Sequence, residues 1–397
     1  MGSDSRTEPV LGYGVLLMAV THVFIHVFDR VYPALFPVFR EEFSLTLPQL
    51  GLIASIPPLF RTLASIPSGY IADRFGSRAA IALSFLIQIS SALAVVWSKS
   101  SLTLFLAIGT LALASTIYHP AALSYTTKLT SDRERSKAIG VQSAGGPLGM
   151  ALGPISLSLL IPYGWRTVYL LWLIPISLLF LGIWRLRPDE EVIRDRGEER
   201  PQEESIEQDE GGYTSLLSLG FVVFLVYSAV RNIGGRLIGS FLPLYLTDVR
   251  RLSVSLASLV FGSVSIMGVF AAPLGGLFAD RFGNKRWLLT VLSASILCLS
   301  LAFLSPNAAL FTLFYFGYSF FNSCGMAANS SIIAELTPTS RRGMGYALFF
   351  LPSSIVGSVA PMIGGFLADW MGLSSLFPLS IAIILASLLL LKFGVKV

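Results

Sequence analysis

The chain has 397 residues, of which 54% are hydrophobic and only 13% charged, and its formal net charge is +5. A soluble globular domain carries about 25% charged residues, so this composition excludes a soluble protein and predicts an all-α membrane protein. Cys298 and Cys324 lie in apolar segments without paired spacing, and only three histidines are present. We therefore expect no disulfide framework, no enzyme activity, no metal and no cofactor.

Twelve apolar stretches are long enough to cross a bilayer, for which about 20 residues suffice. In chain order they are expected at 11–39, 49–72, 79–98, 101–127, 138–161, 166–186, 214–247, 253–279, 287–304, 307–334, 343–368 and 372–392. One hydrophilic segment separates six from six, and its residues 188–210 hold 11 of the 23 acids. The sequence therefore predicts an N-terminal six-helix bundle at 1–187, a cytoplasmic acidic linker at 188–213 and a C-terminal six-helix bundle at 214–397.

The basic residues favour one orientation in the membrane. With both termini in the cytoplasm, 19 of the 28 arginines and lysines fall inside, 5 outside and 4 within helices. This distribution follows the excess of positive charge that cytoplasmic loops carry. We expect a multi-pass protein of the plasma membrane with cytoplasmic termini, and we attribute the net positive charge to this orientation rather than to nucleic-acid binding.

A loop motif occurs twice in the chain. Asp73 and Asp280 stand in the matching segments Gly-Tyr-Ile-Ala-Asp-Arg-Phe-Gly and Gly-Leu-Phe-Ala-Asp-Arg-Phe-Gly, 207 residues apart, and the same offset carries Pro154 onto Pro361. A single copy could be an ordinary positively charged turn after a helix. Two landmarks that share one offset indicate a duplicated six-helix half, which is the architecture of alternating-access carriers.

A stripe of small residues marks the fifth predicted helix. Gly146, Gly149 and Gly153 recur at helical spacing just before Pro154. Such a stripe lets another helix approach closely. Close packing alone would explain it, and a part in the movement between transport states is the functional alternative.

Ionisable groups inside predicted spans are costly in a bilayer and point to function. In the first span His22, His26 and Asp29 fall within about 60° of one another on a helix, with Arg30 on the neighbouring flank. Further polar side chains stand in other spans, and with Arg30 we expect them to bind substrate: Arg61, Tyr118, His119, Gln142, Arg231, Asn232, Arg236, Asn322 and Asn329. Asn322 and Asn329 are seven residues apart and are expected to share a helix face.

The charges inside the membrane are unbalanced. Four arginines stand against one carboxylate, Asp29, with three histidines of variable charge. The planar guanidinium group suits carboxylate and phosphate groups. The sequence therefore favours an organic anion, or an amphipathic compound with an anionic group, over a cationic drug as substrate.

Over essentially its full length the chain resembles the major facilitator superfamily, because the two loop motifs are similar to the signature that follows helices 2 and 8 there. The resemblance implies that these residues clasp neighbouring helix ends on the cytoplasmic side: Asp73, Arg74, Arg78, Asp280 and Arg281. Ser77 stands where the superfamily often has a further basic residue, which would weaken this clasp. The run Gly149-x-x-x-Gly153-Pro154 is similar to the helix-5 motif of the superfamily's exporters, although the final glycine pair of that motif is missing.

The repeat offset relates Asp29 to Arg236, on the first helices of the two halves, which line the central cavity in this superfamily. Asp29 and Arg236 could approach across the cavity and pair in at least one state. Alternatively, Asp29 pairs locally with Arg30 or with a histidine. Arg61 likewise either binds substrate or makes a salt bridge or carbonyl cap within the N-terminal half.

The first 155 residues are similar to the fosmidomycin-resistance branch of proton-driven exporters. The similarity lies in Pro33-x-x-x-Pro37, in Tyr118-His119-Pro120 and in the helix-5 glycines. The acid that this branch carries on helix 1 falls at His26, three residues before Asp29, so either Asp29 or His26 could carry the coupling proton. The acid that the branch carries after the helix-4 His-Pro is Ala121 here, so the branch's substrate is not carried over to this chain.

These observations predict a proton-coupled antiporter in which Asp29, His22 and His26 exchange the proton and which exports an organic anion or an amphipathic drug-like compound. The partners would be the small-molecule substrate, the proton and the lipid bilayer, and we expect a monomer. The alternatives are an importer or facilitator of a small organic anion and a non-transporting sensor on a transporter fold. No ATP-binding loop motif is present.

Overall fold

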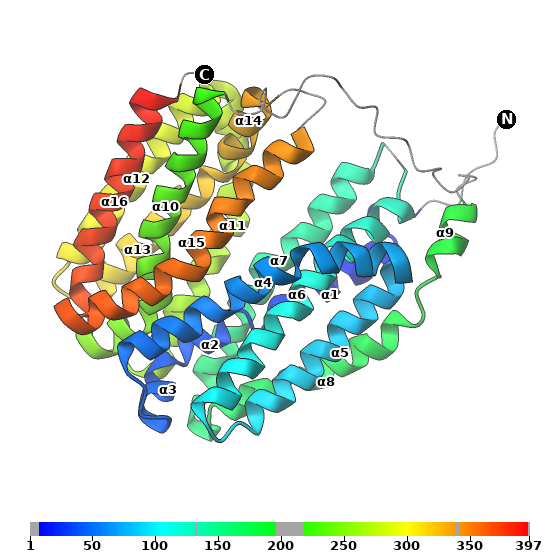
Figure 1. Cartoon of the computed structure of the whole chain (residues 1–397), viewed down its shortest axis with the longest axis horizontal. Coiled ribbons are helices and arrows are strands. Elements are labelled where there is room, and N and C mark those ends of the chain that lie inside the picture. Colours follow the sequence, from blue (N-terminus) through cyan, green and yellow to red (C-terminus); the bar gives the residue numbers. More distant parts are fainter. Residues whose placement is uncertain (1–7, 132, 196–217, 338–341, 396–397) are drawn as a thin grey trace. The chain divides into compact units, whose positions relative to one another are not determined.

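The computed structural model describes residues 8–131, 133–195, 218–337 and 342–395, and within these ranges every regular element is a helix (Figure 1). The predicted all-α architecture is therefore confirmed. By their contacts the helices form two compact units, Met1–Tyr32 with Phe60–Gln208 and Pro33–Leu59 with Asp209–Val397. The bundle boundaries at residues 187 and 214 stay a prediction, and residues 196–213 of the expected linker lie outside the described residues.

The first unit is a bundle in which α1 packs against α7, and α5 packs against both α6 and α8. The helices that lie wholly within it are α1 (Tyr13–His26), α5 (Ser77–Val96), α6 (Ser101–Leu129), α7 (Arg135–Leu160), α8 (Arg166–Ile183) and α9 (Asp189–Asp195). The short helix α2 (Val31–Ala34) and the long helix α4 (Leu47–Phe75) each contribute to both units, and α4 belongs to the first from Phe60 onward.

The second unit is built around α10, which packs against both α15 and α16 (Figure 1). Its helices are α3 (Phe36–Glu42), α10 (Leu219–Leu244), α11 (Val254–Phe282), α12 (Asn284–Leu304), α13 (Ala308–Cys324), α14 (Met326–Leu336), α15 (Arg342–Met371) and α16 (Leu376–Gly394). Arg40 of α3 joins it by donating to both carboxylate oxygens of Asp248, at 2.5 and 3.1 Å. Gly51 of α4 lies so close to α15 that a Cβ there would be 2.5 Å from the Pro361 carbonyl oxygen.

The predicted repeat is visible in local structure. Gly76 and Gly283, 207 residues apart, end the two signature loops with φ angles of 82° and 86°, a region that glycine enters without strain. At the same offset, Ser100 and Asn307 cap the next helix by accepting from Thr103 N and Leu310 N. Each half therefore uses the same turn and the same cap.

Within the described ranges, eleven helices are long and apolar enough to cross a membrane. The remaining predicted span, 307–334, is divided at Gly325 into α13 of 17 residues and α14 of 11. At the division the Cys324 carbonyl accepts from the Trp287 indole at 3.1 Å, and Gly275 of α11 leaves no room there for a side chain. The helix face that Asn322 and Asn329 were expected to share is therefore interrupted between them.

The first predicted span is also interrupted, although the sequence predicts one helix over 11–39. Helix α1 ends at His26, and residues 27–30 form turns before α2. Pro33 has no N–H to donate to the Asp29 carbonyl four residues earlier. Nearer the end of α1, Gln88 of α5 donates to the Phe24 carbonyl at 2.7 Å. The break places Asp29 on a turn beyond the end of α1.

Candidate functional site

All three histidines of the chain meet at one place in the first unit. His22 and His26 lie one turn apart on α1, and His119 comes from α6. One ring nitrogen of each lies within 4.8 Å of the other two, and the ring centroids are 5.0 to 5.4 Å apart. His26 is buried, His22 is half-buried and His119 is exposed.

Each histidine contacts an oxygen through Nδ1. The partner is the backbone oxygen of Gln142 for His22, at 2.7 Å, and the carboxylate of Asp29 for His26, at 2.8 Å. For His119 it is the Ser115 backbone oxygen. These oxygens can only accept a hydrogen bond, so each Nδ1 carries the hydrogen.

This assignment fixes the state of the other ring nitrogens. A neutral imidazole with its hydrogen on Nδ1 has a bare lone pair on Nε2. Nε2 of His26 and Nε2 of His119 are 3.1 Å apart, so two lone pairs would face each other. A cation between them, either a proton or a metal ion, makes this arrangement favourable.

Asp29 is held by two groups of its own unit. Its Oδ2 lies 2.8 Å from Nδ1 of His26 and 2.8 Å from a guanidinium nitrogen of Arg61 on α4. The carboxylate is 12% exposed and Arg61 is 37% exposed. The local pairing that the sequence left open for Asp29 and for Arg61 is thus present, and an approach of Asp29 to Arg236 stays a prediction.

Two of the residues expected to bind substrate, Tyr118 and Gln142, contact α1 beside the histidine cluster. The Tyr118 hydroxyl lies 2.8 Å from Thr21 Oγ1 and donates to the Met18 carbonyl at 2.9 Å, so it ties α6 to α1. Gln142 contributes its backbone oxygen to His22. Both side chains are buried, and their direct contact with a substrate stays a prediction.

The glycine stripe of α7 forms the wall on which α1 rests. A Cβ on Gly146 would come within 3.2 Å of the His22 ring, and a Cβ on Gly149 would overlap the Val23 carbonyl. A Cβ on Gly153 would overlap the carbonyl of Val27. Close packing of α7 on α1 is therefore present, and it holds the histidine-bearing face of α1 in place. A gating role for Gly149, Gly153 and Pro154 remains a prediction.

The second unit holds another polar group. Arg231 of α10 donates to the side-chain and backbone oxygens of Asn322 on α13, at 2.6 and 3.1 Å. The Asn232 amide, one residue on, donates to Ser353 Oγ of α15 at 3.0 Å. The sequence placed these residues in one substrate site; the structure pairs Arg231 with Asn322 and joins Asn232 to α15.

The other two expected substrate residues of this unit lie elsewhere on its helices. Asn329 donates to the Gly325 carbonyl at 2.8 Å, and its buried Oδ1 has no partner among the described residues. Arg236 lies beside Gly357 of α15, where a Cβ would be 3.7 Å from a guanidinium nitrogen.

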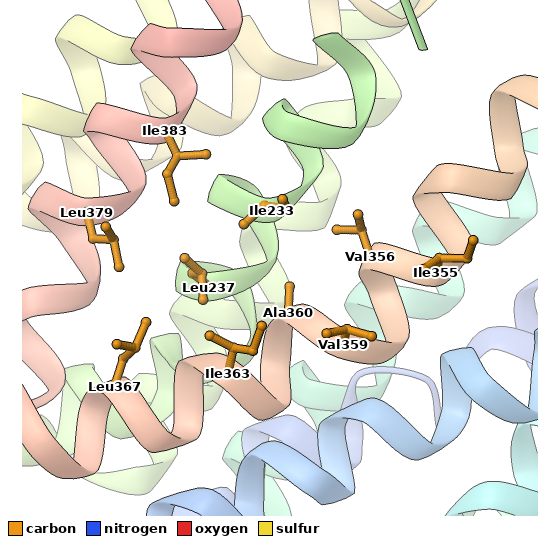
Figure 2. A pocket seen from close by; sticks show the side chains of 10 residues that line it. All are labelled: Ile233, Leu237, Ile355, Val356, Val359, Ala360, Ile363, Leu367, Leu379 and Ile383. Atoms are coloured by element: carbon orange, nitrogen blue, oxygen red, sulfur yellow. The ribbon is translucent and has the colours of Figure 1, made fainter. Parts of the chain in front are cut away.

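An apolar cavity of about 260 Å³ lies in the second unit between α10, α15 and α16. Figure 2 shows its ten aliphatic side chains, among them Ile233 and Leu237 of α10. They offer no hydrogen-bonding group, so the cavity would accept the apolar part of a ligand and not its charge. Sequence reasoning did not find this cavity, because aliphatic residues facing each other across three helices look like ordinary core or lipid-facing residues.

The signature loops make fewer contacts than the resemblance implied. Arg78 donates to the Leu186 carbonyl at 3.0 Å, which joins α5 to the end of α8. Arg74 donates to the Tyr70 hydroxyl of its own helix, and Arg281 lies over the Phe282 ring. In the part of the chain that the structure describes, Asp73 and Asp280 form no ion pair, and their gating role stays a prediction.

The acid that holds the start of α5 is Asp189 of α9, which sequence reasoning assigned only to the linker. Its carboxylate accepts from the backbone N–H of Ser77 at 2.9 Å, from that of Arg78 at 3.2 Å and from Lys128 Nζ at 2.6 Å. An acid at a helix N-terminus satisfies free N–H groups and the helix dipole. In the second unit Asn284 and Glu335, which follow Ser77 and Lys128 by 207 residues, are joined at 2.6 Å.

Asp189 should make stability depend on pH. Burial alone would raise the pKa of this carboxyl, but the hydrogen bonds from Lys128 and Ser77 outweigh burial and hold the pKa below 3.8. A lowered folded-state pKa adds stability that is complete above the unfolded-state pKa and is lost as pH falls through the folded-state value. We expect Asp189→Asn to cost about 0.5–2 kcal/mol at pH 7 and to remove part of the loss of stability below about pH 4. Thermal unfolding from pH 7 to pH 3 measures both effects, and Glu191→Gln, an exposed change on the same helix, should alter neither.

The sequence was compared with a family profile and with known proteins. A sequence profile described as Major Facilitator Superfamily matches residues 18–250 and 216–396. The chain is 22% identical over 368 residues to the fosmidomycin resistance protein of Escherichia coli strain K12, across 92% of this chain and 89% of that one. It is 24% identical over 302 residues to the uncharacterized MFS-type transporter YfnC of Bacillus subtilis strain 168, across 74% and 72%.

A solved structure is also similar in fold. The crystal structure of a bacterial homolog of the human lysosomal transporter Spinster, inward-facing and occupied, matches with a TM-score of 0.77 and 19% identity over 96% of this chain and 95% of that chain. At this identity the likeness concerns the fold alone.

Proposed function

The chain belongs to the major facilitator superfamily, and from this membership we propose that it works as a proton-coupled antiporter. A multi-pass membrane protein that moves a small molecule by secondary transport, and not an enzyme, is what the family and the relatives support directly. Our addition is the coupling ion, the direction and the substrate class. A proton enters while an organic anion or an amphipathic drug-like compound leaves.

The observation that carries this proposal is the position of Asp29. Its carboxylate lies inside the first unit, bound at once by Arg61 and by His26, and His26 in turn faces His119. A proton taken up by Asp29, His22 or His26 changes the charge that Arg61 faces. Proton and anionic substrate then compete for one network, which is the coupling that antiport requires.

The substrate class rests on two features of the second unit. Arg231 and Arg236 stand on α10, and a guanidinium group recognises carboxylate or phosphate. The apolar cavity beside α10 suits the uncharged part of an amphipathic compound. Together with Arg30 and Arg61 in the first unit, these arginines favour an anionic group on the substrate.

The proposal also covers the orientation in the membrane, the oligomeric state and the moving parts. The distribution of basic residues favours the plasma membrane with both termini in the cytoplasm. We propose a monomer, with the signature-loop residues Asp73, Arg74, Arg78, Asp280 and Arg281 acting at helix ends during the transport cycle.

Gly149, Gly153, Pro154 and Pro361 would let the moving helices stay in contact. The same cluster could also serve import of a small organic anion, which differs in the direction of flux.

A flux experiment tests the proposal. Ligands are first selected by thermal shift from a panel of organic anions, phosphorylated metabolites and lipophilic drugs. Proteoliposomes with a trapped pH-sensitive dye then receive an imposed pH gradient and a selected compound. We expect the compound to accelerate collapse of the gradient, and Asp29→Asn with His26→Gln to slow this collapse by about tenfold or more, within the range typical of coupled sites.

The control is Glu41→Gln, which removes an exposed acid from α3 and should transport like the parent chain. Proton-coupled flux that is unchanged in the double variant would refute the assignment. Accumulation rather than extrusion in right-side-out vesicles would favour the importer, and binding without any flux would favour the sensor.

A further inference from the structure

We propose that His22, His26 and His119 form a binding site for one divalent transition-metal ion, with Zn²⁺ and Co²⁺ as representative ions. The site follows from the convergence of three histidines from two helices and stands without the transport proposal. One consequence alone rests on the proposed function: the ion takes the place of the coupling proton and so blocks transport.

The spacing of the ring nitrogens suits such an ion. With metal–nitrogen distances of about 2.0–2.1 Å in a tetrahedral site, neighbouring ligand nitrogens are about 3.3 Å apart. Nε2 of His26 and Nε2 of His119 are already 3.1 Å apart. One ring nitrogen of each histidine lies within 4.8 Å of those of the other two, so a closure of about 1.5 Å would bring these nitrogens to tetrahedral spacing. His119 is the most exposed of the three histidines, so its side chain has the most room to adjust.

The groups behind the histidines prepare the same chemistry. A histidine that binds a metal ordinarily donates its other ring N–H to a carboxylate or a backbone carbonyl, which fixes the ring and makes the ligating nitrogen more basic. Here all three histidines do so through Nδ1, His26 to the Asp29 carboxylate and the others to backbone oxygens. Every Nε2 is thereby left as a free lone pair, which is the form that binds a metal.

The ligand set also selects the class of ion. Imidazole nitrogen suits zinc, cobalt, nickel and copper, whereas magnesium and calcium require oxygen ligands. Three histidines leave one tetrahedral position for water, and the exposure of His119 provides the path by which the ion enters. Sequence reasoning expected no metal because the chain has only three histidines and no paired cysteine spacing. The approach of His119 to α1, 93 residues after His26, depends on the fold.

Metal binding by the purified full-length chain tests the inference. The protein carries a streptavidin-binding tag, because a polyhistidine tag would itself bind metal, and EDTA is removed before titration. Co²⁺ is followed by its visible absorption, and Zn²⁺ by displacement of Co²⁺. We expect one ion per chain and a loss of affinity of about tenfold or more in His119→Ala and in His22→Ala.

Two controls separate this site from others. Cys298→Ser with Cys324→Ser removes both thiols of the chain and should leave the affinity unchanged, because the proposed ligands are the three histidines. Thermal unfolding of each variant without metal checks that it is folded, and Zn²⁺ should raise the unfolding temperature of the parent chain and of the cysteine variant but not that of either histidine variant. Equal Zn²⁺ affinity in the parent chain and both histidine variants, or less than one tenth of an ion per chain, would overturn the inference.

The result of the metal titration is independent of the transport proposal. Proton-coupled flux measured in EDTA does not involve the ion, so it can fail while the metal binds, or succeed while the metal does not. If both hold, Zn²⁺ should inhibit flux in the parent chain, and removal of Zn²⁺ by EDTA should restore it. Flux that persists while Zn²⁺ fills the site would overturn the competition between ion and proton.

Discussion

Replacing Arg61 with glutamine is expected to destabilise the chain by about 1–3 kcal/mol. The Asp29 carboxylate is 12% exposed, and of its two ion-pair partners in the part of the chain that the structure describes it would keep His26. Removing one member of a buried ion pair ordinarily costs about 3–5 kcal/mol, because the remaining charge is uncompensated. Arg61 is 37% exposed, and solvent screening at that exposure reduces the expected cost.

The double variant Arg61→Gln with Asp29→Asn separates loss of the pair from loss of packing. If the uncompensated carboxylate is the cause, neutralising it should recover most of the stability that Arg61→Gln loses, while proton coupling remains lost. Thermal unfolding in detergent measures stability, and Arg74→Gln is the matched control because it removes an exposed arginine from the same helix. If Arg61→Gln alone is as stable as the parent chain, Arg61 does not neutralise Asp29.

The order of the spanning segments could be predicted, and eleven of the twelve have a spanning helix in the described residues, because apolar length and charged loops are local properties of the sequence. The interruptions could not. The break after His26 depends on Gln88, which lies 62 residues farther on and supplies a donor to the freed carbonyl. The break at Gly325 depends on Trp287 and on the close approach of Gly275. Such partners are set by the tertiary fold, so periodicity in one span does not reveal them.

The candidate site was predictable only where its residues are close together in the sequence. His22, His26 and Asp29 lie within one turn or two of each other, and their grouping followed from helical spacing. The contact of His26 with His119 joins α1 to α6, and that of Asp29 with Arg61 joins the turn after α1 to α4. Only the fold shows these contacts. Asp189 was missed because it stands in an acidic run whose other members gave no reason to single it out.

Replacing Gly153 with alanine is expected to destabilise the first unit by about 1–3 kcal/mol, the range for overpacking a tight contact. The added Cβ would overlap the Val27 carbonyl and approach a Val31 methyl group at 2.8 Å. The Val27 carbonyl is backbone of the turns after α1 and the Val31 methyl group is a side chain of α2, so α7 would have to move away from both. That displacement would also carry Gly149 and Gly146 away from the histidine-bearing face.

Gly140→Ala provides the comparison that makes this prediction specific. Gly140 lies on the same helix, and a Cβ there would meet nothing within 4 Å. Alanine is the better helix former by about 1 kcal/mol, so this variant should be as stable as the parent chain or more stable. Opposite signs for the two glycines in thermal unfolding would show that α7 and α1 are held by backbone contact. A stabilising Gly153→Ala would mean that α1 can yield, and the histidine cluster would then rest on a movable support.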